Sequence, residues 1–187
     1  VPAPDFPVKT TLPEAYKIWS KNAETSVIGA VTIPERHEQL KDEDKRILDK
    51  VSCGVSYFIS QCVFNLAYAK QIVEDLSCTC KKENKKLPTL IFTLTACGSA
   101  KTLHFMEWLG INVPEELKES LKNSENVLEN SVNVCLNIAS ELADYCTERS
   151  VPFGFNIESV AIRKEEIDLN NFAADFLNVV KRNFFKG

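Results

Sequence analysis

Two apolar runs of the sequence predict strands. Polar and titratable side chains stand where these two strands should end. The run over residues 27–33 leads into Glu35 and His37, which place a carboxyl group and an imidazole just beyond a strand end. The run over residues 55–60 ends at Gln61, whose amide can donate and accept hydrogen bonds together and suits a heterocycle with adjacent donor and acceptor atoms. Each has an alternative interpretation, because a solvated polar loop that starts a helix, or a Gln bonded to a neighbouring loop, would show the same residues.

Another apolar run, over residues 152–159, carries two polar side chains that should face the same side of a strand. Asn156 and Glu158 are two positions apart, and side chains alternate between the two faces along a strand. Two polar groups inside a parallel sheet are unfavourable unless they are paired or bind a ligand. We therefore predict a binding site here, although an internal pair between Glu158 and an Arg or Lys would also satisfy the two groups.

A Gly/Ser turn at residues 95–102 opens a helix and could bind an anion through free N–H groups. Lys101 and Thr102 give this turn a faint likeness to a phosphate loop, but Thr95 and Ala100 stand where that motif requires glycines. We therefore reject nucleoside triphosphate hydrolysis. The sequence also lacks a Gly-x-Ser-x-Gly elbow, a Cys/His dyad and a Gly-rich dinucleotide loop.

Composition excludes several classes of partner. The 187 residues include 22 Lys+Arg and 26 Asp+Glu, and the net charge of −4 gives no reason to expect nucleic acid or an anionic membrane. The longest apolar stretch, residues 90–97, is about half of the roughly 20 residues needed to cross a bilayer. Among the seven cysteines only Cys78 and Cys80 are close together, and no second pair or nearby His completes a zinc site. We predict buried free thiols, a reducing cytoplasmic location and no metal.

The elements that must position these groups alternate between strand and helix. Strands are predicted at residues 27–33, 55–61, 88–95 and 152–159. Helices are predicted at residues 12–21, 42–51, 65–76, 100–109, 114–122, 124–148 and 165–182. Gly110 should cap the helix at 100–109. This order predicts an α/β fold with parallel strands in one domain over residues 1–187, and it places ligands at the carboxyl ends of the strands. Periodicity alone does not choose between a small doubly wound sheet and half of an eight-stranded barrel.

Two stretches, taken in their order along the chain, resemble the methylenetetrahydrofolate reductase family. In that family a strand ends in Pro-Glu-x-His and is followed by Lys-Val-x-x-Gly and by a strand that ends in Ile-Thr-Gln. Here residues 30–38 have the sequence AVTIPERHE, and residues 49–61 have the sequence DKVSCGVSYFISQ. Residues 105–114, which end in Val-Pro, are similar to the family's segment after strand seven. The resemblance covers roughly residues 12–183.

The resemblance implies a (β/α)8 fold of the TIM-barrel type, of which this chain would supply about the C-terminal half, strands five to eight. It also implies an oxidoreductase of one-carbon folate metabolism, which reduces methylenetetrahydrofolate to methyltetrahydrofolate with bound FAD and NAD(P)H. The family's catalytic acid lies on a first strand that this sequence lacks, so no catalytic residue is assigned. We expect either a piece of a longer protein or a half barrel that pairs with a second copy or another partner.

The resemblance also implies roles for single residues. His37 matches the family's His after strand five, Lys50 matches a Lys at the end of the next helix, and Glu43 stands where the family has Asp. These three positions lie near the flavin in the family. Gln61 matches the Gln that pairs with the folate pterin, in agreement with its amide chemistry.

Other positions depart from the family pattern. Ile33 replaces a Tyr, Arg46 replaces an Asn, and Asp49 replaces an Arg of the flavin site. On the last strand, residues 156–160 replace the family's Tyr-Thr-Leu-Asn-Arg. These changes argue against conventional FAD binding, whereas the folate contact is retained.

The leading prediction is therefore the folate-binding half of a reductase-like enzyme. Glu35, Asn156 and Glu158 would line the pocket beside Gln61, and the ligand would be a reduced folate. The alternative is a non-catalytic module for folate binding, other ligand binding or assembly, which kept the fold and lost the chemistry. A third possibility is an unrelated flavodoxin-like sheet, which would form a compact monomer.

Overall fold

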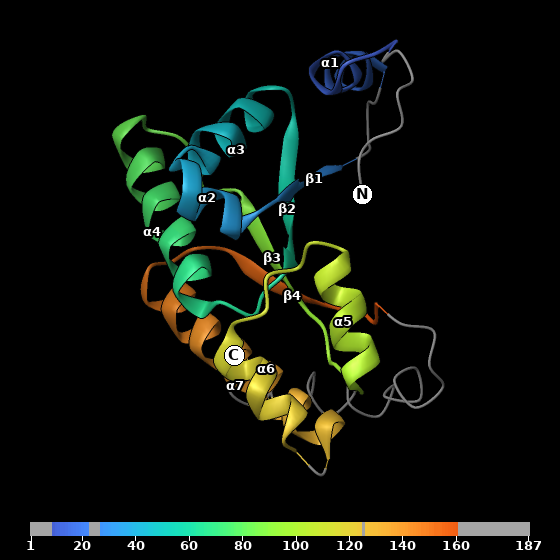
Figure 1. Ribbon diagram of the computed structural model, residues 1–187. Coiled ribbons are helices and arrows are strands. Elements are labelled where there is room, and N and C mark those ends of the chain that lie inside the picture. The colour runs from blue at the N-terminus through green and yellow to red at the C-terminus, as the bar shows by residue number, and fades with distance from the viewer. Residues whose placement is uncertain (1–8, 23–26, 125, 161–187) are drawn as a thin grey trace.

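The computed structural model of the chain describes residues 9–22, 27–124 and 126–160 (Figure 1). The strands are β1 (Ile28–Thr32), β2 (Val55–Cys62), β3 (Thr89–Leu94) and β4 (Phe153–Ile157). The helices are α1 (Leu12–Asn22), α2 (Pro34–Leu40), α3 (Glu43–Ser52), α4 (Leu66–Lys82), α5 (Ala100–Trp108), α6 (Glu115–Lys122) and α7 (Val127–Glu148). The four predicted strands are confirmed, and the predicted helix at residues 165–182 lies outside the described residues.

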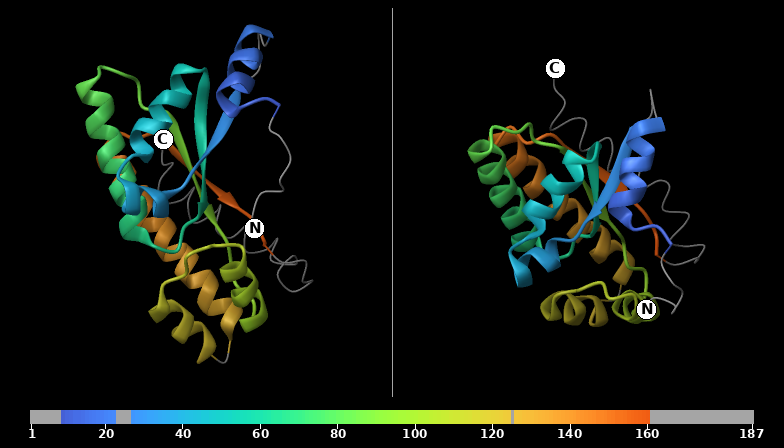
Figure 2. Two further views of the ribbon diagram at one scale, coloured as in Figure 1. Left: turned by 45° about the horizontal axis from the view of Figure 1, so that its top comes forward. Right: turned by 90° about the horizontal axis from the view of Figure 1, so that it is seen from above.

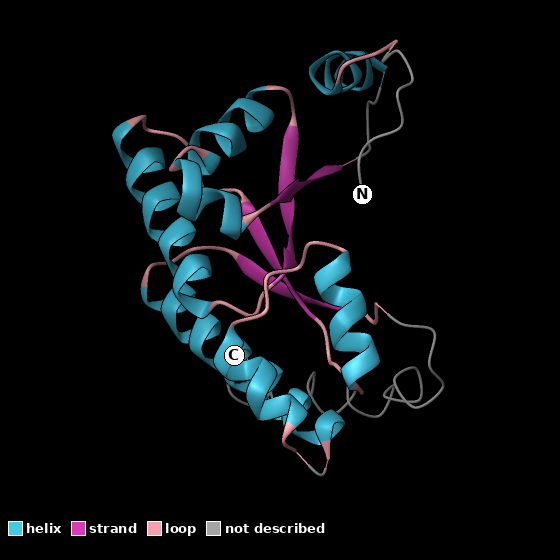
Figure 3. Cartoon of the chain, in the orientation of Figure 1, coloured by secondary structure: helices cyan, strands magenta, loops and turns pink. Residues whose placement is uncertain are grey.

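The strands form one parallel sheet in the order β1-β2-β3-β4, as Figure 3 shows in magenta. Strands that follow one another in the sequence are neighbours in the sheet. Right-handed crossover connections through helices give this order without any two connections crossing each other. The α/β prediction with parallel strands is therefore confirmed. Among the described residues β1 and β4 each pair on one side only, so this sheet by itself does not decide between an open sheet and part of a barrel.

One face of the sheet is covered by a layer formed from α2, α3, α4 and α7, seen on one side of the strands in both views of Figure 2. Side chains that alternate along the strands fill the space between, among them Ala30, Phe58, Leu90 and Phe92. The helices contribute Ile47, Leu48, Ile72, Val73, Leu76, Ile138 and Leu142 to the same core. This burial of apolar surface holds the strands in place, so their carboxyl ends meet at one edge.

The second face of the sheet carries Val31, Tyr57, Ile59 and Ile91, which are neighbours across the strands. Val31 is 54% exposed, and the other three are half-buried. Ile91 on β3 is half-buried, whereas its neighbours Leu90 and Phe92 on the helix-covered face are buried. Gly29 lies directly against Tyr57, where a Cβ atom would come within 2.4 Å of the Tyr57 ring.

Helices α5 and α6 lie beyond the carboxyl ends of the strands and form a smaller core with Phe64, Leu103, Met106 and Leu121. The predicted cap at Gly110 is confirmed. Its φ is +81°, its N–H donates to the Glu107 carbonyl at 2.9 Å, and the Ile111 N–H donates to the Met106 carbonyl at 3.0 Å. This is the paired bonding by which a left-handed glycine ends a helix.

Sequence reasoning missed α2, where it allowed only a polar loop with a helix start. Pro34 occupies the first turn, which favours a helix start, but no side chain caps the helix and it is only 7 residues long. Lys41 ends it with a φ of +51°. Such a short helix depends on its packing against α4 and α3, which the sequence does not display.

All seven cysteines are free thiols. Five are buried as predicted, Cys53 is half-buried, and the prediction is wrong for Cys78, which faces solvent from α4. In the part of the chain that the structure describes, no helix has the length and hydropathy needed to cross a bilayer. The described residues also contain no group of three His, Cys, Asp or Glu side chains arranged to hold a metal ion.

Candidate functional site

Polar side chains from three strands and from the start of α2, which follows β1, lie at the carboxyl edge of the sheet. We call this group the polar rim; it consists of Glu35, Gln61, Cys62, Thr93, Thr95, Asn156 and Glu158. Glu35 stands in the first turn of α2 directly after β1, and the others lie at or just beyond the ends of β2, β3 and β4. Ligands of parallel α/β folds bind at this edge, so the rim is the candidate site.

The β4 side of the rim confirms that Asn156 and Glu158 share one face. The Asn156 side-chain N–H donates to Glu158 Oε2 at 2.9 Å and to Thr93 Oγ1 at 3.3 Å. The internal ion pair that the sequence also allowed for Glu158 is not found among the described residues. Glu158 is exposed and Asn156 is half-buried, so both side chains keep surface for a ligand.

Cys62 brings the β2, β3 and β4 parts of the rim together. Its Sγ atom lies 3.0 Å from Thr95 Oγ1 and 4.0 Å from Glu158 Oε1. Burial raises the pKa of this thiol and outweighs the opposing bond from Thr95, and the carboxylates of Glu158 and Glu35 raise the pKa further. Cys62 is therefore a neutral donor at physiological pH and no nucleophile.

Glu35 approaches the same place from α2. Its Oε2 atom is enclosed and has no hydrogen-bond partner among the described residues. Desolvation raises the pKa of this carboxyl group. Because its charge also acts on the Cys62 thiol, Glu35 lies, like Glu158, within electrostatic range of Cys62. The rim thus has two carboxyl groups, neither of them in an ion pair with a described Lys or Arg.

Gln61 is exposed near the end of β2, between the buried residues Ser60 and Cys62. A register shift between Ile59 and Cys62 makes the ladder irregular here. Thr93 uses its backbone N–H at 2.9 Å and its hydroxyl at 2.7 Å to bond to Ser60 rather than to a regular ladder partner. Irregular ladders are frequent beside functional sites, where they redirect a side chain.

Sequence reasoning missed Cys62 and Thr93 as members of the site and considered Thr95 only as part of a phosphate loop. Their position at strand ends was the signal available, since it is the same signal that selected Gln61. A buried thiol and two hydroxyls are common in ordinary cores, so residue type alone gave no reason to choose them.

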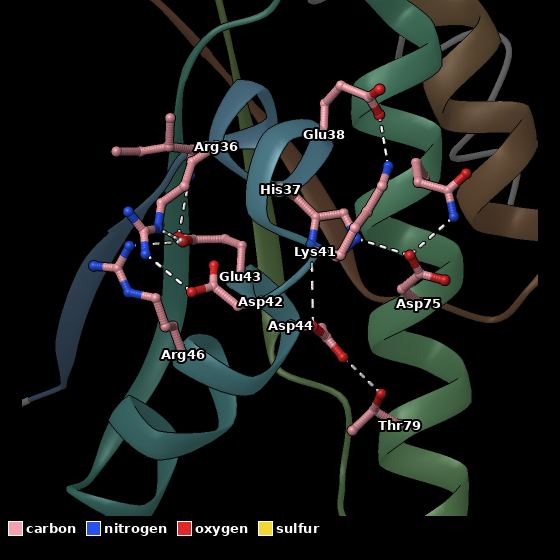
Figure 4. A network of polar contacts seen from close by, with 12 residues as sticks. Arg36, His37, Glu38, Lys41, Asp42, Glu43, Asp44, Arg46, Asp75 and Thr79 are labelled. Carbon is pink, nitrogen blue, oxygen red and sulfur yellow. Dashed lines mark hydrogen bonds and ion pairs between the residues drawn. The ribbon is translucent and has the colours of Figure 1, made fainter.

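The three residues expected near a flavin, His37, Glu43 and Lys50, contact protein groups that do not belong to the rim. His37 is 1% exposed; its Nε2 atom lies 2.8 Å from Asp75 Oδ2 on α4, and its Nδ1 atom lies 4.0 Å from Asp44 Oδ1 on α3 (Figure 4). Asp44 in turn accepts a bond at 2.8 Å from the Thr79 hydroxyl. His37 therefore joins α2 to the two helices beside it.

Glu43 is also 1% exposed, and its carboxylate joins α3 to the end of β1. Glu43 Oε1 accepts the Ile33 N–H at 3.3 Å, while Oε2 accepts a bond from Arg46 at 3.0 Å and lies 3.5 Å from Arg36 Nε (Figure 4). Arg36 also pairs with Asp42 at 3.0 Å. A carboxylate with these partners is satisfied by the protein itself.

Lys50 donates to the Val31 carbonyl at 2.7 Å and lies 5.8 Å from the centre of the Phe58 ring. Burial lowers the pKa of its ammonium group. Together with Arg46 it lines two adjoining surface cavities of about 560 and 410 Å³ between α1, α3 and β1. Glu43 lines the second of these cavities, and His37 lines neither. The flavin assignment of these residues stays a prediction.

Comparison with solved structures gives a similarity that bears on this edge of the sheet. No protein-family model matches the chain, and no curated protein matches it. A solved structure that it resembles is an uncharacterized protein from Clostridium thermocellum that binds two copies of 5-methyl-5,6,7,8-tetrahydrofolic acid. The two sequences are 44% identical, with a TM-score of 0.83 over 90% of this chain. The present chain spans about 59% of the length of that protein.

Proposed function

We propose that this chain is a reduced-folate-binding module that takes 5-methyltetrahydrofolate at the polar rim. The similarity to a methyltetrahydrofolate-binding protein at 44% identity is the observation that carries the proposal. The polar rim supplies groups that can bind such a ligand. It includes the side-chain amides of Gln61 and Asn156 and two carboxyl groups, at the edge where parallel sheets bind ligands.

A reduced pterin has a row of N–H donors and one carbonyl along its edge, and a flat ring with apolar faces. Gln61 can donate to the carbonyl and accept from a ring N–H with one side chain. Tyr57, Ile59 and Ile91 stand next to the rim on the second face of the sheet, half-buried and able to contact a ring face. This mixture of apolar surface and a few convergent polar groups is typical of small-molecule sites.

The proposal is for binding rather than reduction. The reductase activity that the resemblance implies would need FAD or NAD(P)H. His37 and Glu43, two of the three residues assigned to a flavin, direct their polar atoms to Asp75, Arg46 and the backbone of Ile33. FAD, NAD(P)H and hydride transfer stay predictions, tested by whether the purified chain carries flavin fluorescence or oxidises a nicotinamide when methylenetetrahydrofolate is supplied.

We also propose that the four strands are half of an eight-stranded barrel. Parallel sheets are normally covered on both faces, yet Val31 is 54% exposed on β1 and Val27 just before it is 68% exposed. Over most of its length the chain resembles a protein that is longer than itself. This similarity supports the presence of a further strand beside β1. Either further polypeptide or a second copy of the chain would complete the sheet. The free thiols support a reducing, cytoplasmic location.

Isothermal titration of the 187-residue chain with 5-methyltetrahydrofolate tests the binding proposal. We expect saturable binding that weakens about 10-fold in Gln61→Ala, because one net hydrogen bond is worth roughly 1 kcal/mol and the polar ring edge is left unpaired. Gln39→Ala is the matched control, since Gln39 is an exposed glutamine on α2, outside the rim. Absence of binding by the unmodified chain contradicts the proposal, and equal affinity in both variants contradicts the role of Gln61.

A further inference from the structure

The hydrogen bonds of Asn156 on β4 determine which end of its side-chain amide is available to a ligand. The Nδ2 atom donates to Glu158 Oε2 at 2.9 Å and to Thr93 Oγ1 at 3.3 Å. A primary amide has two N–H donors, so the protein itself uses both. The Oδ1 atom accepts no bond from a described residue, and it is not one of their enclosed atoms without a partner. Asn156 is half-buried, so Oδ1 keeps surface that a ligand can reach.

The two partners of Asn156 fix this orientation, because each of them can only accept. An ionised carboxylate has no proton to donate, which makes Glu158 an acceptor at neutral pH. Thr93 has a single hydroxyl proton and donates it to the Ser60 carbonyl at 2.7 Å, so its oxygen is left to accept from Asn156. A half-turn of the amide would set Oδ1 against two acceptors, which is unfavourable. The direction of the amide thus follows from its partners, and Oδ1 faces away from them.

Asn156 is held by the sheet, whereas Gln61 is free to turn. Thr93 is 1% exposed and stands directly beside Asn156 in the ladder between β3 and β4. Two bonds join Thr93 to Ser60 on β2, so the amide is anchored through three strands. The Gln61 side-chain amide is exposed and bonds to no group of the described residues. A group that is already in place loses little conformational entropy on binding, so Asn156 Oδ1 is a pre-organised acceptor.

Building on the proposed function, we propose that Asn156 Oδ1 accepts a hydrogen bond from an N–H group of the reduced pterin ring. Thr93 and Glu158 act through Asn156 and are positioning residues. Because the acceptor is fixed, it favours a ligand with a donor at this point and disfavours one that presents an acceptor there. Gln61 can present either end of its amide, so it contacts the ring carbonyl or a further N–H.

The main experiment exchanges the acid and the amide of the pair and measures the affinity for 5-methyltetrahydrofolate by calorimetry. Asn156→Asp places a second carboxylate against Glu158, and repulsion between the two charges should turn the new side chain away. We expect this variant to bind at least about 10-fold more weakly. In Asn156→Asp/Glu158→Gln, the amide at position 158 donates to the carboxylate at position 156, whose second oxygen still accepts from the ligand. This exchanged variant should bind within about 3-fold of the unmodified chain.

The exchange distinguishes an acceptor from a donor at position 156. If Asn156 donated to the ligand, Asn156→Asp and the exchanged variant would both lack that donor, and both would bind weakly. Glu158→Gln alone should change the affinity by less than about 3-fold, since the amide oxygen of the new side chain can still accept from Asn156. Recovery of affinity by the exchange therefore supports an accepting Oδ1 atom.

Folic acid indicates which N–H group meets Oδ1. Its oxidised ring keeps the N3–H and the 2-amino group, but its N8 atom carries no proton and is an acceptor. A contact at N8 should make the unmodified chain bind folic acid poorly, and Asn156→Ala should then leave that affinity unchanged or raise it. A contact at N3–H or at the 2-amino group should make Asn156→Ala weaken both ligands by the same factor. Either result agrees with Asn156 as an acceptor.

Three single variants keep the test independent of the folding of Asn156→Asp. Asn156→Ala removes the oxygen without adding a charge and should weaken 5-methyltetrahydrofolate about 10-fold. Thr93→Val removes the acceptor that holds the amide and should also weaken the ligand, whereas Thr93→Ser keeps the hydroxyl and should retain the affinity within about 3-fold. Equal affinity in the two Thr93 variants contradicts the positioning role. Urea unfolding followed by circular dichroism checks that each variant is folded.

Asn126 and Glu129 provide a matched control outside the rim. Asn126 Nδ2 donates to Glu129 Oε2 at 2.8 Å at the start of α7, and both side chains are exposed. Asn126→Asp and Asn126→Asp/Glu129→Gln should leave the affinity unchanged. Full affinity in Asn156→Asp or Asn156→Ala, or a loss that persists in the exchanged variant of Asn156 and Glu158, overturns the inference. If the unmodified chain fails to bind 5-methyltetrahydrofolate, the proposed function fails and this inference fails with it.

Discussion

Truncation of His37 should test whether this residue serves the fold or a cofactor. The imidazole is 1% exposed and bonds to Asp75 on α4 at 2.8 Å, with Asp44 on α3 at 4.0 Å on its other side. It is the side chain through which α2 contacts both neighbouring helices in the polar network of Figure 4. We therefore expect His37→Ala to destabilise the protein and His37 to be coupled energetically to Asp75.

The expected loss of stability in His37→Ala has two contributions. Removal of a fully buried ring leaves a cavity, for which about 2–3 kcal/mol is expected. The hydrogen bond to a charged partner would be worth about 1.5–3 kcal/mol if it were buried. Asp75 is 37% exposed, so water replaces much of that bond, and about 1 kcal/mol remains. The sum of about 3–4 kcal/mol corresponds to a fall of roughly 6–16 °C in melting temperature for a chain of this size.

The assay is a double-mutant cycle in urea, followed by circular dichroism, on His37→Ala, Asp75→Ala and the combination. The coupling free energy between the two sites should be about 1 kcal/mol. Glu38 and Lys41 form the control pair, because they stand on and just after the same helix and approach at 2.6 Å but are exposed. Their coupling should be no more than about 0.5 kcal/mol.

The pH dependence of the free energy of unfolding provides a second test of the contact between His37 and Asp75. Desolvation raises the pKa of Asp75, but the bonds from Gln71 and His37 outweigh it and the net pKa is lowered. A lowered carboxyl pKa contributes stability above the unfolded value of about 4, and this stability is lost as the pH falls through the folded value. In Asp75→Ala the free energy of unfolding should therefore fall less steeply with decreasing pH in that acid range than in the unmodified chain. A coupling near zero together with a total effect below about 1 kcal/mol would refute the structural role and return His37 to the candidates for cofactor binding.

Two further predictions concern the second face of the sheet and its edge. Gly29→Ala should lower the free energy of unfolding by no more than about 1 kcal/mol, because the new methyl group meets only the far end of the half-buried Tyr57 side chain, which can turn away. Gly154→Ala should change it by less than about 1 kcal/mol, since its nearest neighbour would be Ile91 Cγ1 at 3.9 Å. Urea unfolding of both variants measures this, and a loss above about 3 kcal/mol in Gly29→Ala would show that Tyr57 is held rigidly in place. Sedimentation of the 187-residue chain at micromolar concentration should show self-association through the β1 edge, and Val31→Lys should shift the chain toward monomer because a charge discourages strand pairing. A chain that is monomeric at every concentration would contradict a second copy as the partner.

The sequence by itself determined the four strands, and it indicated the edge of the sheet at which we propose the site. Apolar runs rich in β-branched residues, separated by amphipathic segments, are local signals, and all four strands were predicted within about two residues. The alternation of Asn156 and Glu158 along β4 and the glycine that ends α5 are local in the same way. Each depends on the backbone period or on a single dihedral angle, and needs no knowledge of a distant residue.

Only the tertiary structure decided which polar groups are already satisfied. His37, Glu43 and Glu35 are all titratable residues near the end of β1, and the sequence offered no means of ranking them. Asp75, 38 positions along the chain, lies within hydrogen-bond distance of His37 Nε2, and Arg46, 3 positions along, donates to Glu43. The enclosed Oε2 atom of Glu35 and the buried Nδ1 atom of His37 have no hydrogen-bond partner among the described residues. The same holds for Cys62, whose neighbours Thr95 and Glu158 come from other strands. Burial and pairing depend on contacts between distant segments, and the fold alone brings those segments together.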